Sequence, residues 1–180
     1  SESMSKSKKN VVDPEFIINN YGADSVRLFI LSDSPPEKDV QWSEQGMVSS
    51  YKFIQKLWIL HKEIYYKITH ETEDDADKDF EKFTNQLIVK FTNNLEKFNY
   101  NVIIANMYET YNYLISFIKN KKNIKNLRKN YKKILICFSP VIPHFSNECL
   151  SQLNLTSEIS WPEYKQNFLE DINVNFVIQI

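Results

Sequence analysis

The sequence predicts an all-α protein: a bundle of amphipathic helices, preceded by a loop with short helices and followed by a terminal strand. Apolar residues recur at spacings of three and four through most of the chain, which is the period of an α-helix. Only two of the 180 residues are glycine, whereas all-β sandwiches and barrels need many tight turns. With 42% hydrophobic and 25% charged residues, the composition is that of a globular domain. We therefore expect one main core built from long helices.

Two short helices are predicted after the N-terminal loop. The first begins at Pro14, since Asp13 is a good N-cap and proline suits the first helical position, where an N–H group would have no partner. It ends before Gly22, which can adopt the left-handed conformation of a helix cap. Residues 23–31 predict the second helix, and Pro35-Pro36 then breaks the pattern.

A long amphipathic helix is predicted from Ser43 to about His70, on the order of 40 Å at 1.5 Å per residue. Its apolar positions are Met47, Tyr51, Ile54, Leu57, Trp58, Ile64, Tyr65 and Ile68. Residues 71–79 carry six acidic side chains and no large apolar one, so they are expected to form an exposed connection.

Further helices are predicted between this connection and Leu153. One spans 80–98, and Asn99 can serve as the N-cap of the next, which spans 103–118. Another spans 127–138 and is interrupted by prolines before an apolar continuation. Four or five helices are thus expected to pack as a bundle. Beyond them, residues 174–180 are β-branched and alternating, which predicts a strand.

The N-terminal residues 3–14, SMSKSKKNVVDP, contain groups that can bind phosphate. The hydroxyls of Ser5 and Ser7 and the ammonium of Lys6 suit the charged oxygens of a triphosphate, with lysine acting as a mobile point charge. Terminal Ser/Lys runs are also common in disordered tails, so these residues alone leave both interpretations open.

Several blocks, in this order, resemble the leucyl-tRNA synthetases, a family of class I aminoacyl-tRNA synthetases. The loop is similar to the Lys-Met-Ser-Lys-Ser loop of that class, with Ser3 in place of the first lysine. The other blocks are Tyr21 to Phe29 (YGADSVRLF), Ser34 to Ser43 (SPPEKDVQWS), Ser139 to Phe145 (SPVIPHF) and Trp161-Pro162. The resemblance spans nearly the whole chain, with residues 71–79 uninformative.

The resemblance implies that Met4, Ser5, Lys6 and Ser7 bind ATP, and that Lys6 acts in catalysis by supporting charge on the departing pyrophosphate. It implies a leucine–tRNA ligase activity, in which leucine is activated with ATP and transferred to leucine tRNA. The fold it implies is the anticodon-binding helical bundle. A cytoplasmic location is expected, since neither a signal peptide nor the ~20 apolar residues of a membrane span occurs in the sequence. The enzyme is expected to be a monomer.

The expected division of the chain follows from this resemblance. Residues 1–41 would form the loop and connecting helices at the end of a catalytic region, 42–165 the bundle, and 166–180 the linker and first strand of a truncated domain. No strand, Gly-rich turn and helix follow one another, so the isolated chain is expected to be inactive. A fragment of an isoleucyl, valyl or methionyl synthetase, or a stand-alone helical RNA-binding module, remains an alternative.

Basic residues concentrate between Lys119 and Lys133, where eight of fifteen positions are Lys or Arg, although the net charge of the chain is only -1. On a helix, four of them fall on one face, from which they can neutralise RNA phosphates without reading sequence. A solvated helix face is the alternative. The predicted RNA-binding residues are Lys121, Lys125, Arg128, Lys129 and Lys132.

The remaining candidates are expected to be structural. Cys137, His144 and Cys149 lack the paired spacing and the fourth ligand of a metal site, so no metal is predicted and both thiols are expected to be buried. His61 and His70 are expected to have structural partners rather than catalytic roles.

Asp24 and Arg27 are expected to pair with each other and to support the loop. The tyrosines are expected in the core and at its rim, with stacking on unpaired bases as the alternative. They are Tyr65, Tyr66, Tyr108, Tyr111 and Tyr113.

Overall fold

The computed structural model describes residues 3–5, 7–8, 10–33, 38–120, 123–157 and 159–168. Its helices are α1 (Pro14–Tyr21), α2 (Ala23–Asp33), α3 (Glu44–His70), α4 (Lys78–Glu96), α5 (Tyr100–Asn120), α6 (Leu127–Phe138), α7 (Pro143–Gln152) and the 3-10 turn η1 (Gln166–Phe168). No sheet occurs in this part of the chain, which contains one isolated bridge, between Asp74 and Ile124. The all-α prediction is confirmed, whereas the strand predicted at 174–180 lies outside the described residues.

Local caps begin the early helices where the sequence predicts. Asp13 accepts a hydrogen bond from the Glu15 amide at 3.0 Å, and Ser43 accepts one from the Gly46 amide at 3.1 Å. Gly22 ends α1 with φ 80° and ψ 152°, so the chain turns directly into α2. A positive φ is a conformation that glycine adopts without a steric penalty.

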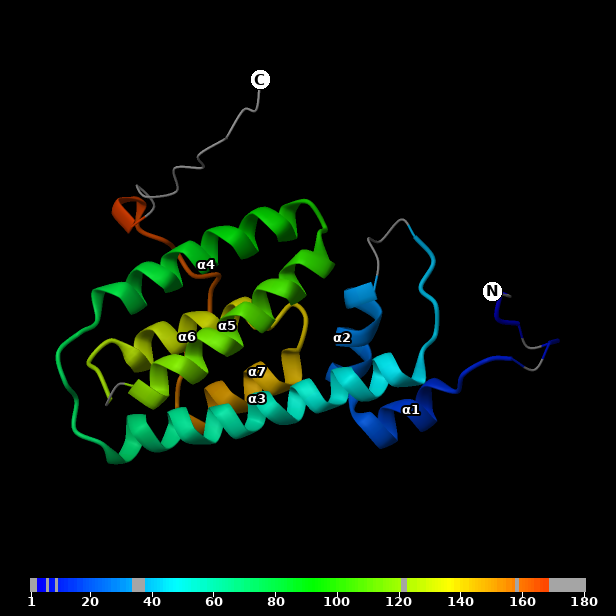
Figure 1. The fold of residues 1–180 in the computed structure, drawn as a ribbon, viewed down its shortest axis with the longest axis horizontal. Helices are drawn as coiled ribbons and strands as arrows, with labels where there is room; N and C mark the ends of the chain where they lie inside the picture. The colour runs from blue at the N-terminus through cyan, green and yellow to red at the C-terminus, as the bar shows by residue number, and fades with distance from the viewer. Residues whose placement is uncertain are drawn as a thin grey trace, which may run out of the picture.

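The helices α3 to α7 form the bundle, with α3 running along one side of it (Figure 1). Large side chains that are fully or almost fully buried fill its centre, so the apolar periodicity identified the core. They include Ile64, Phe80, Phe91, Met107 and Phe138. The five-helix bundle agrees with the expected four or five helices.

A second, small apolar cluster attaches α1 and α2 to the start of α3. It consists of the buried side chains Ile17, Phe29 and Met47, with Trp42 packed edge-to-face on Phe29 at 5.3 Å. Gly46 lies against this cluster, since a Cβ atom there would come within 2.7 Å of the Phe29 ring. The glycine therefore permits close contact between α2 and α3.

The acidic connection 71–79 is exposed as predicted, but it is also anchored. The Asp74 amide donates to the carbonyl oxygen of Asn123 at 2.7 Å, and the Asp74 carbonyl accepts from the Lys125 amide at 3.0 Å. The Asn126 side chain adds two bonds to the backbone of Asp77, at 3.1 and 2.9 Å. These bonds join the start of α4 to the start of α6.

Candidate functional site

The described residues of the predicted phosphate loop are closed by the Asn10 side chain. Its Oδ1 accepts from the Ser5 amide at 2.9 Å, and its Nδ2 donates to the carbonyl of Ser3 at 3.3 Å. The hydroxyl oxygens of Ser5 and Ser7 lie 3.2 Å apart, so both can reach one anionic group. This role of Asn10 was not predicted.

Of the other predicted loop residues, Met4 is 46% exposed. Lys6, the predicted catalytic residue, lies outside the described residues. The loop leads through Asp13 into α1 and stands away from the bundle (Figure 1). Two hydroxyls held on a loop before a helix can donate to phosphate oxygens.

Asp24 and Arg27 of α2 connect this region to the bundle by holding the turn between α6 and α7. The Asp24 carboxylate accepts from the amides of His144 at 3.3 Å and Phe145 at 2.7 Å, at the start of α7. The Arg27 guanidinium donates to the carbonyls of Pro140 at 2.7 Å and Val141 at 3.0 Å. The expected Asp24–Arg27 pair is therefore wrong: each side chain bonds to the turn instead of to the other.

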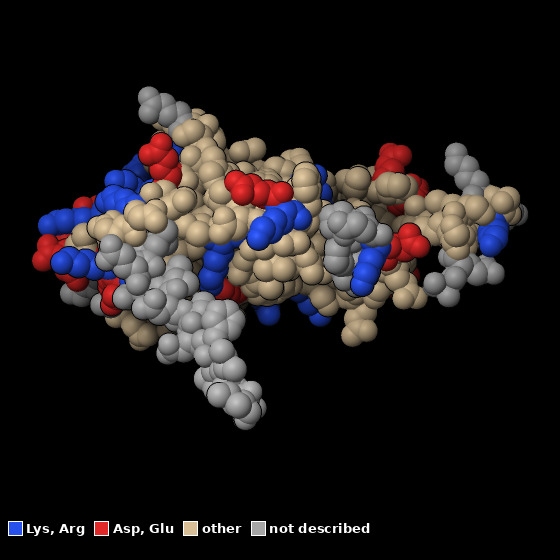
Figure 2. Space-filling view, turned by 90° about the horizontal axis from the view of Figure 1, so that it is seen from above, with Lys and Arg blue, Asp and Glu red and all other residues tan. Residues whose placement is uncertain are grey.

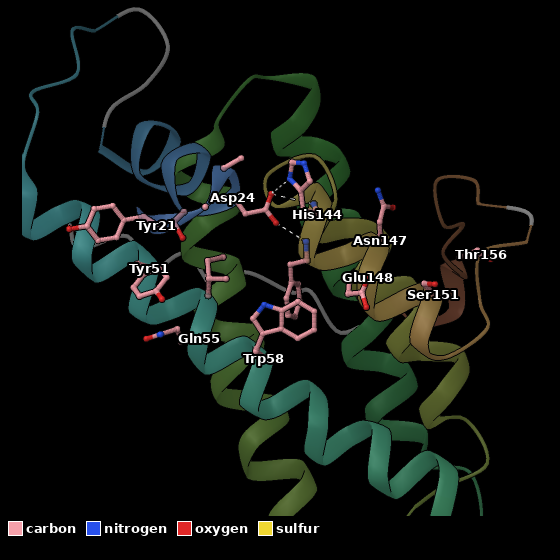
Figure 3. Close-up of a pocket in the computed structure, with 15 residues that line it drawn as sticks. Tyr21, Asp24, Tyr51, Gln55, Trp58, His144, Asn147, Glu148, Ser151 and Thr156 are labelled. Atoms are coloured by element: carbon pink, nitrogen blue, oxygen red, sulfur yellow. Dashed lines mark hydrogen bonds and ion pairs between the residues drawn. The ribbon is translucent and has the colours of Figure 1, made fainter. Parts of the chain in front are cut away.

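The physical reason is that this turn presents groups of both polarities. The start of α7 has free N–H groups that attract a carboxylate, and the preceding turn has free carbonyls that attract a guanidinium. His144 adds a third contact, with its Nδ1 2.9 Å from the Asp24 carboxylate (Figure 3). Since Asp24 is 7% exposed, water cannot easily replace these bonds.

One sequence signal pointed to this contact and was missed. Ile142 occupies the N-cap position of α7 and makes no side-chain capping bond. A helix that begins with an apolar cap must obtain acceptors for its first amides elsewhere. The acceptor is 120 and 121 residues away in sequence, so no local pattern could identify it.

The predicted RNA-binding residues do not form one free stripe. Lys125 precedes α6 rather than lying on it, and its Nζ pairs with the Asp75 carboxylate at 3.1 Å. Arg128 donates to the carbonyl of Leu153 at 2.6 Å. Lys132 donates to the carbonyl of Ser157 at 3.0 Å.

These bonds have different consequences for the basic charge. Lys125 and its carboxylate partner are 60% and 98% exposed, so this ion pair is weak and easily exchanged. A carbonyl oxygen does not neutralise Arg128 or Lys132, so their positive charges remain. The Lys129 side chain is exposed and makes no hydrogen bond or ion pair to the described residues. Lys121 lies outside the described residues.

Lys133, which was not among the predicted contacts, is half-buried beside Lys129. Its Nζ lies 3.5 Å from the carbonyl oxygen of Glu163. Burial, followed by repulsion from Lys129, lowers the pKa of Lys133. In Figure 2, Lys and Arg gather at the end of the bundle where α4 begins, with Asp and Glu among them. This end therefore has a mixed rather than a purely basic surface.

The tyrosines are mostly committed to packing. Tyr108 stacks on Phe53 at 3.8 Å, and Tyr113 stacks on Phe83 at 3.7 Å. Burial, followed by the charges of Asp77 and Asp79, raises the pKa of Tyr113 to about 12. Tyr111 also packs on Phe53, whereas Tyr66 is 58% exposed and stacks on His70 at 4.6 Å.

His61 and the two cysteines are buried, and His61 has side-chain partners. His61 is fully buried, with Nδ1 3.0 Å from the Tyr131 hydroxyl and Nε2 3.1 Å from Gln152 Oε1. Burial lowers the pKa of His61. Cys137 and Cys149 are buried free thiols. Within the described ranges, no group of three His, Cys, Asp or Glu side chains could hold a metal ion, and no helix is long and apolar enough to cross a membrane.

Two protein families match this chain. Residues 77–180 match the anticodon-binding domain of tRNA ligase, and residues 2–43 match the class I tRNA synthetases for Ile, Leu, Met and Val. The first match covers more than half of the chain. The second includes the predicted phosphate loop and both residues that hold the α6–α7 turn.

Individual relatives match the chain along its length. It is 34% identical to a leucine–tRNA ligase of Bartonella tribocorum over 194 residues, which cover 99% of the chain and 22% of the relative. It is 37% identical to a leucine–tRNA ligase of Orientia tsutsugamushi over 184 residues, which cover 99% of the chain and 21% of the relative. The chain thus spans about a fifth of the length of these relatives.

A solved structure has a similar fold. It is the ternary complex of Agrobacterium radiobacter K84 agnB2 LeuRS-tRNA-LeuAMS, with a TM-score of 0.78 over 92% of this chain and 22% of that one. Because the two sequences are 21% identical, this likeness supports the fold alone.

Proposed function

The chain belongs to the anticodon-binding domain family of tRNA ligases, and we propose that it is the tRNA-binding portion of a leucine–tRNA ligase. That enzyme would activate leucine with ATP and transfer it to the 3′ end of leucine tRNA. The observation that carries the proposal is the similarity to leucine–tRNA ligases over 99% of the chain. The isolated chain would be inactive, because it contains no nucleotide-binding sheet within the described residues.

The N-terminal loop would contribute to the ATP site of the whole enzyme. The paired hydroxyls of Ser5 and Ser7 would donate to phosphate oxygens, and Met4 would lie beside them. Lys6 would stabilise the negative charge that develops on the leaving pyrophosphate, which is electrostatic stabilisation of a transition state. Asn10 would hold the loop closed around these groups, as its two bonds to Ser5 and Ser3 suggest.

The bundle would contact the tRNA backbone through the basic residues around the start of α6. Lys129 is exposed and makes no hydrogen bond or ion pair to the described residues, and Lys125 can exchange its weak pair with Asp75 for a phosphate. Arg128 and Lys132 would act by their charge while they hold the following segment. Lys121 would add a further charge. Such contacts bind RNA without reading its sequence.

The division of the chain predicted from the sequence is kept as part of the proposal. Residues 1–41 would be the end of the catalytic region, and Ile17 and Phe29 from this part form a small cluster with Met47, while Leu28 packs in the main core. Residues 42–165 would be the bundle, and 166–180 would lead into a further domain.

A cytoplasmic monomer is the proposed state of the whole enzyme.

The bundle's role can be tested by fluorescence anisotropy with labelled leucine tRNA across a salt series. A variant with both Lys125→Ala and Lys129→Ala should bind several-fold more weakly, with a salt slope smaller by about 0.9 for each phosphate that is no longer neutralised. The matched control carries Lys52→Ala and Lys56→Ala, which remove two exposed lysines from α3. Equal affinities and slopes for the two double variants would contradict the proposed surface.

A further inference from the structure

An open groove of about 910 Å³ lies where α2 begins, between α3 and α7 (Figure 3). Its floor is apolar: Ile54 and Phe145 are 8% and 3% exposed. Trp58 is half-buried and packs edge-to-face on Phe145 at 4.9 Å. Part of the indole therefore remains available to a further side chain.

The rim of the groove is acidic. Among the described residues that line it there is no lysine and no arginine, but there are two carboxylates, Asp24 and Glu148. Asp24 already accepts hydrogen bonds from two backbone amides and contacts the His144 ring. Glu148 is exposed and accepts one hydrogen bond from the neutral Gln152 amide, at 2.9 Å. Its negative charge has no cation to neutralise it in the groove.

The apolar floor and the acidic rim together determine which kind of ligand the groove can bind. Phosphate would be repelled by Glu148 and would find no cation on the rim, so the groove is a poor site for the RNA backbone. A lysine or arginine would pair with Glu148. An aliphatic or aromatic neighbour of that cation would cover the exposed part of Trp58, which is a typical apolar anchor at interfaces.

The position of the groove indicates the source of the occupant. Its lining includes residues 21–25, from the part that matches class I tRNA synthetases, and residues 144–156, from the part that matches the anticodon-binding domain, with α3 between the two. The chain spans only 22% of the Bartonella tribocorum relative, so in such a protein most of the polypeptide lies outside the matched part and can supply a docking segment. The junction between the two matched parts is where that docking is expected.

We propose that this groove docks a peptide segment of the same polypeptide, in which a lysine or arginine stands beside an apolar residue. The cation pairs with Glu148 and the apolar residue packs on Trp58. The identity of the source rests on the proposed function, since it requires the remainder of a ligase. The pairing of the cation with Glu148 and the packing of the apolar residue on Trp58 do not rest on the proposed function, and they can be tested on this chain alone.

The chemistry is tested by NMR titration of the chain with acetyl-leucyl-arginyl-leucinamide. Saturable shifts of the Trp58 indole signal are expected, and acetyl-leucyl-glutamyl-leucinamide should bind more weakly, since its carboxylate is repelled by Glu148. Glu148→Gln should raise the Kd roughly two- to fivefold, which is the value of one exposed ion pair. The control Glu96→Gln removes an exposed carboxylate at the end of α4 and should leave the Kd unchanged. Absence of saturable shifts, or equal binding of both peptides, would overturn the proposal.

The source is tested by photo-crosslinking in the whole ligase, with p-benzoylphenylalanine in place of Asn147 on the rim and, as a control, in place of Glu96. A cross-link from position 147 to another segment of the polypeptide that contains lysine or arginine is expected. A cross-link to tRNA, or none, would overturn the docking site. Leucylation measured in parallel separates the two proposals: an enzyme that charges tRNA without this cross-link refutes the docking site alone.

Discussion

Removing the Asp24 carboxylate should destabilise the protein more than any exposed acidic substitution. The side chain is 7% exposed and accepts from two backbone amides and one imidazole. In Asp24→Ala the amide of Phe145, a residue that is 3% exposed, loses its acceptor at 2.7 Å. Hydrogen bonds to charged groups contribute about 1.5–3 kcal/mol, and an unsatisfied buried donor costs about 1–3 kcal/mol. A loss of about 2–4 kcal/mol in the free energy of unfolding is therefore expected.

Urea unfolding followed by far-UV circular dichroism measures this loss. Asp24→Asn retains one acceptor oxygen but presents an NH2 group to the second amide, so about half of the loss is expected. Asp39→Ala is the matched control because Asp39 is exposed, and it should change the stability by less than about 0.5 kcal/mol. If Asp24→Ala is as stable as this control, the carboxylate does not hold α7.

Arg27 provides a second check, because it holds the same turn from the same helix. Arg27→Met removes the two bonds to Pro140 and Val141 and retains an apolar side chain. If Asp24 and Arg27 hold the turn jointly, their effects should not add. The double variant Asp24→Ala/Arg27→Met should then lose at least about 0.5 kcal/mol less stability than the sum of the losses in the two single variants. Strict additivity would mean that the two contacts act independently.

Four further outcomes follow from individual residues. Gly22→Ala should lower the free energy of unfolding, measured with urea, by about 1–3 kcal/mol. The φ of 80° and ψ of 152° at this position strain a residue with a Cβ atom, although no neighbouring atom would clash with it. Unchanged stability would contradict this. Burial lowers the pKa of His61 below 6.5, so the unfolded chain binds more protons than the folded one. The free energy of unfolding should therefore fall as the pH drops below 6.5, by at most about 1.4 kcal/mol per pH unit. Urea unfolding at several pH values should show a smaller dependence of this free energy on pH for His61→Gln. Burial raises the pKa of Cys137 to about 12 and also raises the pKa of Cys149. Neither thiol should therefore react with a disulfide reagent at neutral pH until the protein unfolds. Fast labelling of the folded chain would contradict the burial. In the whole ligase, Lys6→Ala should reduce ATP–pyrophosphate exchange roughly 10²–10³-fold, and an unchanged rate would remove Lys6 from the proposed mechanism.

The helices could be predicted because their causes are local. The apolar spacing of α3, the Asp13 and Ser43 caps and the break at Gly22 each depend on residues within a few positions of one another. The same holds for the burial of His61, which follows from its place on the apolar stripe of α3. Local causes do not show which helices touch, so the bundle was predicted as a class and not as an arrangement.

The candidate site could be predicted only in part. The hydroxyls of Ser5 and Ser7 lie together because they are two residues apart on one loop. The basic residues were placed on one helix face by their spacing, but α6 begins at Leu127, so Lys125 lies before it. The carbonyls that hold Arg128 and Lys132 belong to a segment 25 residues further along the chain. Sequence spacing contains no information on such partners.

The sequence by itself determined the all-α class, the approximate extents of the helices, the apolar core and a resemblance that runs the length of the chain. Only the tertiary structure decided the partners of Asp24 and Arg27, the acidic groove beside them and which basic charges remain accessible. The physical reason is the range of the interactions. Helix formation is governed by neighbours within about four residues, whereas the bonds of Asp24 and Arg27 join groups 113 to 121 positions apart, which come together only when the whole bundle packs.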